Sequence, residues 1–473
     1  MTSYGLVIGG NSVKTESDFA VYNKYSGEEM GRVSKAEKSH VEAAVASAEE
    51  TFKNDSLSPY ERYEILNKAA HLLKERKEEI AKVLVGEVGK TITEARVEAD
   101  RAVQTMLLSS EEAKRLSGEI VPISASPGSE NRFGYYIRVP IGVVCAITPF
   151  NVPLNLACHK IGPAIAAGNT VVWKPASDTP LSAFILMEIL TEAGLPAGYV
   201  NLICGSGSKV GQWLLEDERI GKYTFTGSPG VGKEIKEKSG LRNVSLELGN
   251  NSPNIIHKDA DLEKAAQSCV KWGFTTAGQA CISVQRIYVH NDIKQEFLEK
   301  MVKYTKEVIV GDPMDDRTTI GPLISEKEAI RVKEWIDEAV SQGAKIVTGG
   351  SQNGPFIEPT ILEDVEETMK VVCEEIFGPV VTILPFDELE EAIQKANNSN
   401  YGLQSGIFTS NINTAMYAVK KLHTGGVIIN DGSTYRADLM PYGGVKNSGI
   451  GNEGPHYAIE EMTELKTVVM NLS

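Results

Sequence analysis

Three short stretches of the sequence carry residue types that could perform covalent chemistry on a small molecule. Cys281 follows a glycine- and threonine-rich run in GFTTAGQACISVQR; a thiolate is a strong nucleophile, although a cysteine alone is more often buried packing. Glu247 lies in the apolar run VSLELG, where a carboxylate is either paired or has a raised pKa and can act as a base. Asn151 lies between two prolines in TPFNVP, so its amide could stabilise an oxyanion, unless it only caps a turn.

Two further stretches have features of a nucleotide-binding site. FTGSPGVGKEI follows a predicted strand and opens a predicted helix, where Gly227 and Gly232 allow close backbone approach and free N–H groups can bind a pyrophosphate. The spacing is not GxGxxG, and such a turn can also serve packing alone. In VVWKPAS, Lys174 at the end of a predicted strand would project into the same crevice, the alternative being an exposed lysine at a sheet edge.

Composition and charge exclude several other classes of protein. With 48 Lys and Arg against 63 Asp and Glu in 473 residues, the net charge of −15 provides no positive field for nucleic acid or an anionic membrane. The six cysteines form no CxxC pair and the seven histidines show no ligand spacing, so we predict free thiols in a reducing cytoplasm and no metal site. No run approaches about 18 apolar residues, so neither a signal peptide nor a membrane-spanning helix is predicted.

The predicted elements place these motifs at the edge of a parallel sheet. Residues 36–116 have helical spacing, with 58–90 as one stretch that ends near Gly89, and residues 118–140 predict paired strands. From residue 141 strands and helices alternate, which indicates a parallel sheet that binds ligands beyond the carboxyl ends of its strands. A second alternating series follows, and the tail TELKTVVMNLS predicts a terminal strand. The predicted fold is therefore α/β, with two Rossmann-like parallel domains and a small β arm.

In this order and at these spacings, the motifs resemble those of the NAD(P)-dependent aldehyde dehydrogenases of the hydrolytic type, over essentially the whole chain. The 34 residues that separate Glu247 from Cys281 also match the family pattern. The resembling segments are TPFN (148–151), KPA (174–176), FTGSPGVG (225–232), LELG (246–249), GQAC (278–281), EEIFGP (374–379) and PYGGVKNSGIGNEG (441–454).

The resemblance implies a domain plan and an assembly. It implies a homodimer or homotetramer, in which the C-terminal strand covers an exposed sheet edge of a neighbour. The implied parts are a cofactor-binding domain at 1–117 and 141–247, a catalytic domain at 248–437, an oligomerisation arm at 118–140 and 455–473, and a return segment at 438–454.

The resemblance also implies roles for individual residues. Cys281 would attack an aldehyde carbon, Asn151 and the Cys281 backbone N–H would hold the oxyanion, and Glu247 would activate the water that hydrolyses the thioester. NAD or NADP would accept the hydride. The implied cofactor contacts are Ile147, Thr148, Pro149, Phe150, Lys174, Ser177, Gly227, Ser228, Gly232, Leu248, Glu375 and Phe377.

Two departures from the commoner family pattern refine this picture. Ser177 stands where many NAD-preferring relatives carry a glutamate, so a 2′-phosphate would meet no repulsion and could pair with Lys174; we expect NADP to be tolerated. Asn250 and Asn251 follow LELG where relatives carry Gly-Lys. Because asparagine tolerates a left-handed backbone, we expect the turn beside Glu247 to survive.

Positions around the nucleophile bear on the substrate. Relatives specific for phosphorylated aldehydes often carry arginine directly before the nucleophile, where this chain has Ala280. The residue after the oxyanion asparagine, Val152, is also apolar. These two positions therefore do not favour a strongly anionic substrate. Arg101 and Arg436 remain candidate contacts to a substrate carboxylate or hydroxyl, whereas Arg286 is assigned to a structural ion pair. The expected substrate is a small polar aldehyde, such as a hydroxyaldehyde or a semialdehyde.

Three other functions compete with this interpretation. A CoA-acylating aldehyde dehydrogenase typically lacks the base carboxylate, so Glu247 favours hydrolysis. A non-catalytic binding protein of the same fold could lose Cys281 or Asn151, and both are present. A thiol hydrolase would need a histidine near Cys281, and His159, which is more typical of helix packing, would leave Lys174 without a role.

Overall fold

The apolar runs after residue 141 build a mostly parallel eight-stranded sheet in the computed structural model, which describes residues 2–472. The strand order is β22-β12-β11-β8-β9-β10-β2-β3, in which β12 through β10 run parallel and the edges are antiparallel. The strands are β2 (Leu6–Ile8), β3 (Asn11–Val13), β8 (Val143–Ile147), β9 (Thr170–Lys174), β10 (Val200–Leu202), β11 (Ile220–Thr226), β12 (Asn243–Glu247) and β22 (Gly449–Ile450).

The register of this sheet brings four strand ends to one edge. Ile147 pairs with Lys174 across β8 and β9, and with Phe225 across β8 and β11. Thr226 pairs in turn with Glu247. Because these strands are parallel, their carboxyl ends share one side of the sheet, as the alternating pattern predicts.

Helices cover both faces of the eight-stranded sheet. They are α1 (Lys38–Asn54), α2 (Pro59–Glu75), α3 (Lys77–Val88), α4 (Ile92–Ala113), α5 (Pro153–Ala167), α6 (Leu181–Ala193), α7 (Gly207–Glu216) and α8 (Pro229–Lys238). The single helical stretch predicted over 58–90 is wrong: the backbone leaves helical geometry at Arg76 (φ −91°, ψ 13°), which ends α2 and starts α3. The predicted stop at Gly89 is confirmed, since that residue is left-handed (φ 87°).

A second, seven-stranded sheet follows residue 247, with the order β15-β18-β19-β14-β13-β20-β21. All its neighbours run parallel except β15. Its strands are β13 (Pro253–Ile256), β14 (Arg286–His290), β15 (Lys345–Thr348), β18 (Thr360–Glu363), β19 (Val380–Phe386), β20 (Gln404–Phe408) and β21 (Gly426–Ile429). Its helices are α9 (Leu262–Phe274), α10 (Lys294–Lys306), α11 (Glu326–Ser341), α12 (Lys370–Cys373), α13 (Leu389–Asn397) and α14 (Ile412–Lys421). The predicted α/β class with two parallel sheets is confirmed, and each sheet has its own apolar core.

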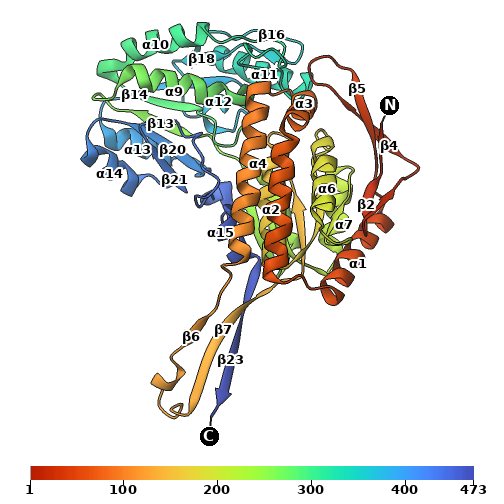
Figure 1. Cartoon of the computed structure of the whole chain (residues 1–473). Helices are drawn as coiled ribbons and strands as arrows, with labels where there is room; N and C mark the ends of the chain where they lie inside the picture. Colours follow the sequence, from red (N-terminus) through yellow and green to blue (C-terminus); the bar gives the residue numbers. More distant parts are fainter. Residues whose placement is uncertain (1, 473) are drawn as a thin grey trace.

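A three-stranded ribbon projects away from the two sheets (Figure 1). It consists of β6 (Glu119–Val121), β7 (Arg132–Pro140) and the C-terminal β23 (Thr463–Asn471), so the predicted strand pair and terminal strand are confirmed. Within the chain, β23 pairs with β7 of the same molecule, from Thr463–Pro140 to Asn471–Arg132. Its other edge has no partner strand among residues 2–472.

The remaining elements are short. Near the N-terminus, β1 and β4 flank β5 in a small sheet that the sequence analysis did not predict. The bounds are β1 (Ser3–Tyr4), β4 (Asp18–Tyr22), β5 (Glu29–Ser34), β16 (Gln352–Asn353), β17 (Phe356–Ile357) and α15 (Pro455–Glu461). No helix within residues 2–472 is both long and apolar enough to cross a membrane.

Candidate active site

A cavity of about 550 Å³ opens at the carboxyl edge of the eight-stranded sheet and brings most of the predicted site residues together. Its lining includes Ile147, Thr148, Pro149, Phe150, Asn151, Lys174, Gly227, Ser228, Glu247, Leu248, Cys281, Glu375 and Phe377. Two predicted contacts do not line it. The Ser177 hydroxyl donates to the Gly205 carbonyl at 2.9 Å, and Gly232 serves packing, since a Cβ there would lie 2.5 Å from a methyl of Leu248.

The candidate nucleophile follows a turn of unusual backbone. After α9 ends, Thr276 (φ 52°) and Ala277 (φ 53°) are both left-handed, and Gly278 (φ 71°) continues the turn. For a residue with a Cβ this conformation costs about 1–2 kcal/mol, so other contacts must hold it. The Cys281 Sγ hydrogen-bonds with the Tyr442 hydroxyl at 3.0 Å. Burial raises the pKa of Cys281 to about 12, and the Tyr442 hydrogen bond acts in the opposite direction.

The predicted oxyanion donor lies beside this turn. Asn151 is buried just ahead of α5, whose first residue is Pro153, and its side-chain Nδ2 donates to the Gln279 carbonyl at 2.8 Å. That carbonyl lies two residues before Cys281. One N–H of the amide is therefore fixed against the nucleophile turn, and the other stays available to a substrate oxygen.

The predicted base ends β12 in a fully buried position. The Oε2 atom of Glu247 has no hydrogen-bond partner within residues 2–472. Burial, reinforced by the nearby Glu453 carboxylate, raises the pKa of Glu247 well above its usual value. Burial also opposes ionisation of Glu453, but the charges of Lys160 and Arg436 hold the pKa of Glu453 well below its usual range. The surroundings thus disfavour ionisation of Glu247 and favour ionisation of Glu453.

Behind Glu453 lies a buried cluster that the sequence analysis identified only in part. Lys160 Nζ and Arg436 Nη2 each donate to Glu453 at 2.9 Å. The Arg436 guanidinium also stacks on the Tyr442 ring, with Cζ 3.7 Å from the ring centroid. Arg436 was a candidate, whereas Lys160, Glu453 and Tyr442 had been given no role. A buried lysine inside an otherwise apolar helix, NLACHKIGPA, is the one local signal of this cluster.

Asp438 contacts two other candidates, Arg101 and His159, beside this cluster. It accepts from Arg101 Nη2 at 2.7 Å and lies 2.9 Å from His159 Nε2. Although burial opposes it, hydrogen bonds from His159 and Arg101 lower the pKa of Asp438 below its usual range. His159 is buried, as its predicted packing role requires, and the recorded hydrogen bond of the Cys281 thiol goes to a tyrosine. The Cys–His hydrolase alternative therefore gains no support.

The turn after Glu247 does not use a left-handed backbone. Asn250 and Asn251 both have negative φ angles, so tolerance of a left-handed backbone does not explain how this turn is kept. Their side chains instead bridge neighbouring loops: Asn250 Nδ2 donates to Ser252 Oγ at 2.7 Å, and Asn251 Nδ2 donates to the Val372 carbonyl at 3.0 Å. The ion pair predicted for Arg286 is also wrong, because its Nε donates to the Asn251 carbonyl at 2.7 Å.

The other end of the cavity has the donor set of a dinucleotide site. Lys174 is buried, and its Nζ donates to the Pro175 carbonyl at 3.2 Å. Ser228, the N-cap of α8, makes no side-chain cap hydrogen bond, which leaves the first N–H groups of that helix for an anion. Burial raises the pKa of Glu375 to about 7, and a Cβ at position 249 would lie 2.5 Å from its Oε2. A cation, a helix N-terminus and a carboxylate thus line one cavity.

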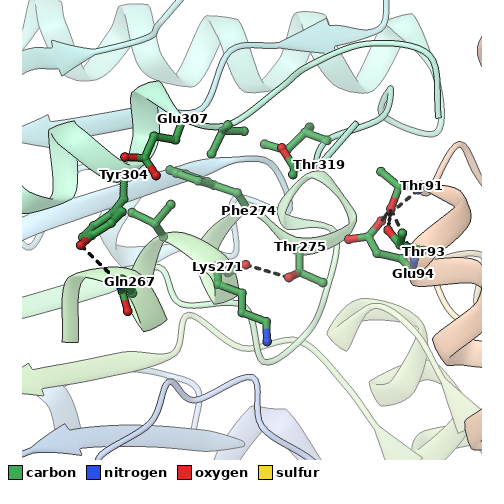
Figure 2. Close-up of a pocket in the computed structure, with 13 residues that line it drawn as sticks. Thr91, Thr93, Glu94, Gln267, Lys271, Phe274, Thr275, Tyr304, Glu307 and Thr319 are labelled. Atoms are coloured by element: carbon green, nitrogen blue, oxygen red, sulfur yellow. Dashed lines mark hydrogen bonds between the residues drawn. The ribbon is translucent and has the colours of Figure 1, made fainter. Parts of the chain in front are cut away.

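A smaller second cavity lies beside Thr275 and contains none of the predicted site residues (Figure 2). Phe274, Tyr304 and Thr319 surround it, and Glu94 and Thr91 form one edge. Its lining contains no cysteine and none of the residues predicted for catalysis or cofactor binding.

Comparison with known proteins places these features in context. The model of the Aldehyde dehydrogenase family matches residues 12–468. A 3-sulfolactaldehyde dehydrogenase of Priestia aryabhattai is 55% identical over 469 residues, which covers 99% of this chain and 98% of the relative. A lactaldehyde dehydrogenase of Methanococcus aeolicus is 41% identical over 461 residues, covering 96% and 97%.

Two solved structures of aldehyde dehydrogenases have the same fold as this chain. Aldehyde dehydrogenase 21 from Physcomitrella patens, in complex with the reaction product succinate, has a TM-score of 0.97 and 40% identity, covering 100% of this chain and 98% of the other. Glyceraldehyde-3-phosphate dehydrogenase GapN from Methanocaldococcus jannaschii, complexed with NADP, has a TM-score of 0.93 and 40% identity, covering 97% and 100%.

Proposed function

Because the chain belongs to the aldehyde dehydrogenase family, it is an NAD(P)-dependent aldehyde dehydrogenase, and we propose that Cys281, Asn151 and Glu247 carry its chemistry. The observation that carries this proposal is their convergence in one cavity, with the Asn151 amide fixed 2.8 Å from the Gln279 carbonyl of the nucleophile turn. The cavity also holds the cation, helix N-terminus and carboxylate that a dinucleotide requires.

In the proposed reaction, the Cys281 thiolate forms a bond to the aldehyde carbon, and the carbonyl oxygen becomes an oxyanion. Asn151 Nδ2 and the Cys281 backbone N–H donate to that oxyanion, and the loss of one such donor typically lowers the rate by about 10²–10³. Once hydride has left, a thioester remains on Cys281. Ionised Glu247 takes a proton from a water molecule that attacks the thioester; the C–S bond breaks, the carboxylic acid leaves and the Cys281 thiolate is restored.

NAD or NADP, when bound, supplies the hydride acceptor. Lys174 and the first turn of α8 would bind the adenosine and pyrophosphate parts, and Glu375 would bind a ribose near Phe377. Phe377 packs edge-to-face on Phe150, with ring centroids 5.8 Å apart, so the wall of this end is rigid.

For the substrate, we propose a small 2-hydroxyaldehyde that carries an anionic group, with 3-sulfolactaldehyde as the first candidate, in contrast to the expectation drawn from Ala280 and Val152. The Nε of buried Arg436 has no hydrogen-bond partner within residues 2–472, and its guanidinium stacks on Tyr442, which contacts Cys281. Three cations, Arg101, Lys160 and Arg436, outnumber the two ionised carboxylates that they contact, Asp438 and Glu453. The relatives named for sulfolactaldehyde and lactaldehyde both act on 2-hydroxyaldehydes by their names.

A cofactor-reduction assay tests this function. Purified protein is given 3-sulfolactaldehyde, lactaldehyde, glyceraldehyde or propanal with NAD or NADP, without CoA, and Cys281→Ala is the control. We expect reduction by the wild type only, with the highest kcat/KM for 3-sulfolactaldehyde and the lowest for propanal. Equal rates on propanal would exclude an anion-binding role for Arg436, and turnover only with CoA would exclude Glu247 as the deacylating base.

The cellular setting and the assembly remain part of the proposal. All six cysteines are free thiols, which suits a cytoplasmic enzyme. The arm exposes apolar side chains such as Ile120 (71%) and Leu465 (58%), and one edge of β23 has no partner strand within residues 2–472. We therefore retain a homodimer or homotetramer built through residues 118–140 and 455–473, with cofactor binding by 1–117 and 141–247 and catalysis by 248–437. Light scattering at defined protein concentration would measure the subunit number, and a monomer would contradict this arrangement.

A further inference from the structure

Helix α4 carries two glutamates one turn apart, half-buried Glu94 and buried Glu98, and each holds one of the loops that meet at the active site. Glu94 Oε1 accepts from the Thr276 backbone N–H at 2.6 Å, in the left-handed turn before Cys281. Glu98 Oε1 accepts from the backbone N–H groups of Leu154 and Asn155 at 2.9 and 3.2 Å, at the start of α5 just after Asn151. Residues four apart lie on the same face of a helix, so a single turn of α4 contacts both loops.

Each carboxylate is itself fixed by the chain around it. Glu94 Oε2 accepts from the Thr91 N–H and hydroxyl, both at 3.0 Å, in a capping box at the start of α4. Figure 2 shows Glu94 and Thr91 together at the start of this helix. Glu98 Oε2 forms a buried ion pair with Lys90. Neither side chain is free to follow a loop that moves.

The nucleophile turn needs such a support. Thr276 and Ala277 hold a backbone conformation that disfavours a Cβ. Within the turn, the backbone N–H and the side-chain Nε2 of Gln279 both donate to the Thr276 carbonyl, at 3.0 and 3.1 Å. On its opposite side a Cβ at Gly278 would lie 2.1 Å from the Gly378 carbonyl oxygen, so the turn is pressed against a neighbouring loop. Glu94 thus restrains the turn from one side and Gly378 from the other.

We propose that Glu94 and Glu98 are positioning residues that set the placement of Cys281 relative to Asn151. This inference rests on the proposed roles of those two residues. The nucleophile turn follows α9 of the second sheet, whereas Asn151 follows β8 of the first. The direct hydrogen bond from Asn151 to the Gln279 carbonyl joins them, and α4 is the shared element that holds both loops. An error of about 1 Å between a nucleophile and its partner groups can lower a rate by about 10².

Two probes separate the two halves of the proposal without any aldehyde. Iodoacetamide alkylates Cys281 by displacement of iodide: an S–C bond forms, iodide leaves, and no oxyanion develops. With 4-nitrophenyl acetate, the thiolate adds to the carbonyl carbon through an oxyanion, 4-nitrophenolate leaves, and water later releases acetate. The first rate reports the nucleophile turn alone, and the second reports the turn together with Asn151.

We expect Glu94→Gln, which places an amide N–H against donors, to slow both reactions by about tenfold. We expect Glu98→Gln to slow only the acylation by about tenfold, with alkylation within about twofold of wild type. Glu111→Gln is the matched control, since Glu111 is a partly exposed residue of the same helix that pairs with Lys114 and Arg115. In the Asn151→Ala background, Glu98→Gln should have little further effect on acylation, because it acts through Asn151.

Other outcomes overturn the proposal. If Glu98→Gln slows alkylation as much as acylation, or if neither variant slows a rate more than Glu111→Gln does, the two residues do not position the two loops as proposed. Circular dichroism and thermal melts check that each variant folds. If Glu94→Gln does not fold, Glu94→Asp replaces it in the same two assays, because aspartate keeps the charge but is shorter by one methylene. If no aldehyde is oxidised by the wild type, the proposed function fails while these two rates still decide the roles of Glu94 and Glu98.

Discussion

The Tyr442 hydroxyl lies 3.0 Å from the Cys281 sulfur, and the ring that carries it is stacked under the Arg436 guanidinium. The hydrogen bond lowers the pKa of the thiol against the much larger effect of burial, which raises it. Tyr442 is itself buried, and its pKa lies well above the usual value, so its hydroxyl keeps its proton and donates to a thiolate. Tyr442 is therefore the side chain in direct contact with the sulfur that favours ionisation of the Cys281 thiol.

Replacement of Tyr442 by phenylalanine should therefore shift thiol reactivity to higher pH. A hydrogen bond to a charged group contributes about 1.5–3 kcal/mol, so alkylation at a fixed pH near 8 should slow by about tenfold or more. The pH profile of the iodoacetamide rate measures this. Tyr435→Phe, at an exposed tyrosine of the same loop, is the control, and an unchanged profile in Tyr442→Phe would show that the contact does not stabilise the thiolate.

Replacement of Glu247 by glutamine should block release of the acid while leaving formation of the thioester intact. Pre-steady-state absorbance should then show a burst of about one equivalent of reduced cofactor per site, followed by very slow turnover. Because the pKa of Glu247 is raised and the base must be ionised, wild-type deacylation should accelerate as pH rises through and above neutrality. A linear time course in Glu247→Gln, at the wild-type rate, would assign the base to another residue.

Replacement of Glu453 by glutamine should destabilise the protein strongly. It leaves the buried charges of Lys160 and Arg436 without their carboxylate partner, which typically costs about 3–5 kcal/mol. The pKa of Glu453 is lowered in the folded state. Its carboxylate therefore contributes to the free energy of unfolding above the pKa that it has in the unfolded chain, about 4, and this contribution is lost as pH falls below that value. Denaturant melts at pH 7 and pH 4 should show a smaller difference between variant and wild type at pH 4. Glu460→Gln, at an exposed ion pair with Arg138, should change stability by under about 1 kcal/mol.

Replacement of Ser177 by glutamate should select against NADP. Ser177 lies three residues after Lys174, and a carboxylate there would repel a 2′-phosphate while leaving the NAD ribose hydroxyls free to bind. We expect KM for NADP to rise about tenfold or more and KM for NAD to stay within about twofold, so that NAD serves as the internal control. Equal changes for both cofactors would mean that position 177 acts only through the Gly205 loop.

The sequence could predict site residues that lie at the ends of apolar strand-like runs. Glu247 and Lys174 close apolar runs, and parallel strands bring such ends to one edge, so their meeting follows from topology alone. For Cys281 and Asn151 a single motif was not enough evidence of a catalytic role, because isolated motifs of this kind are common. The order and spacing of several motifs along the chain gave the additional evidence, and both residues line the cavity.

The groups that the sequence did not reveal act over long separations. Tyr442 is 161 residues from Cys281, Lys160 is 293 from Glu453, and Glu94 is 182 from Thr276. No periodicity or short motif encodes a contact between such distant positions. The wrong expectation at Asn250 has a related cause: a local rule about left-handed turns was applied where the side chain is held by Ser252 and by the Gln404 carbonyl.

The close approach of Gly278 to Gly378 limits how this enzyme can change over evolutionary time. A methyl group at 278 would collide with the carbonyl oxygen of 378, and Phe377, which lines the main cavity, is the adjacent residue. A substitution at Gly278 therefore displaces both the nucleophile turn and a wall of the cavity at once, whereas a Cβ at Gly378 would lie 2.7 Å from a methyl of Val332. Variants with altered substrate range should arise by mutation of side chains around these two turns, with both glycines retained.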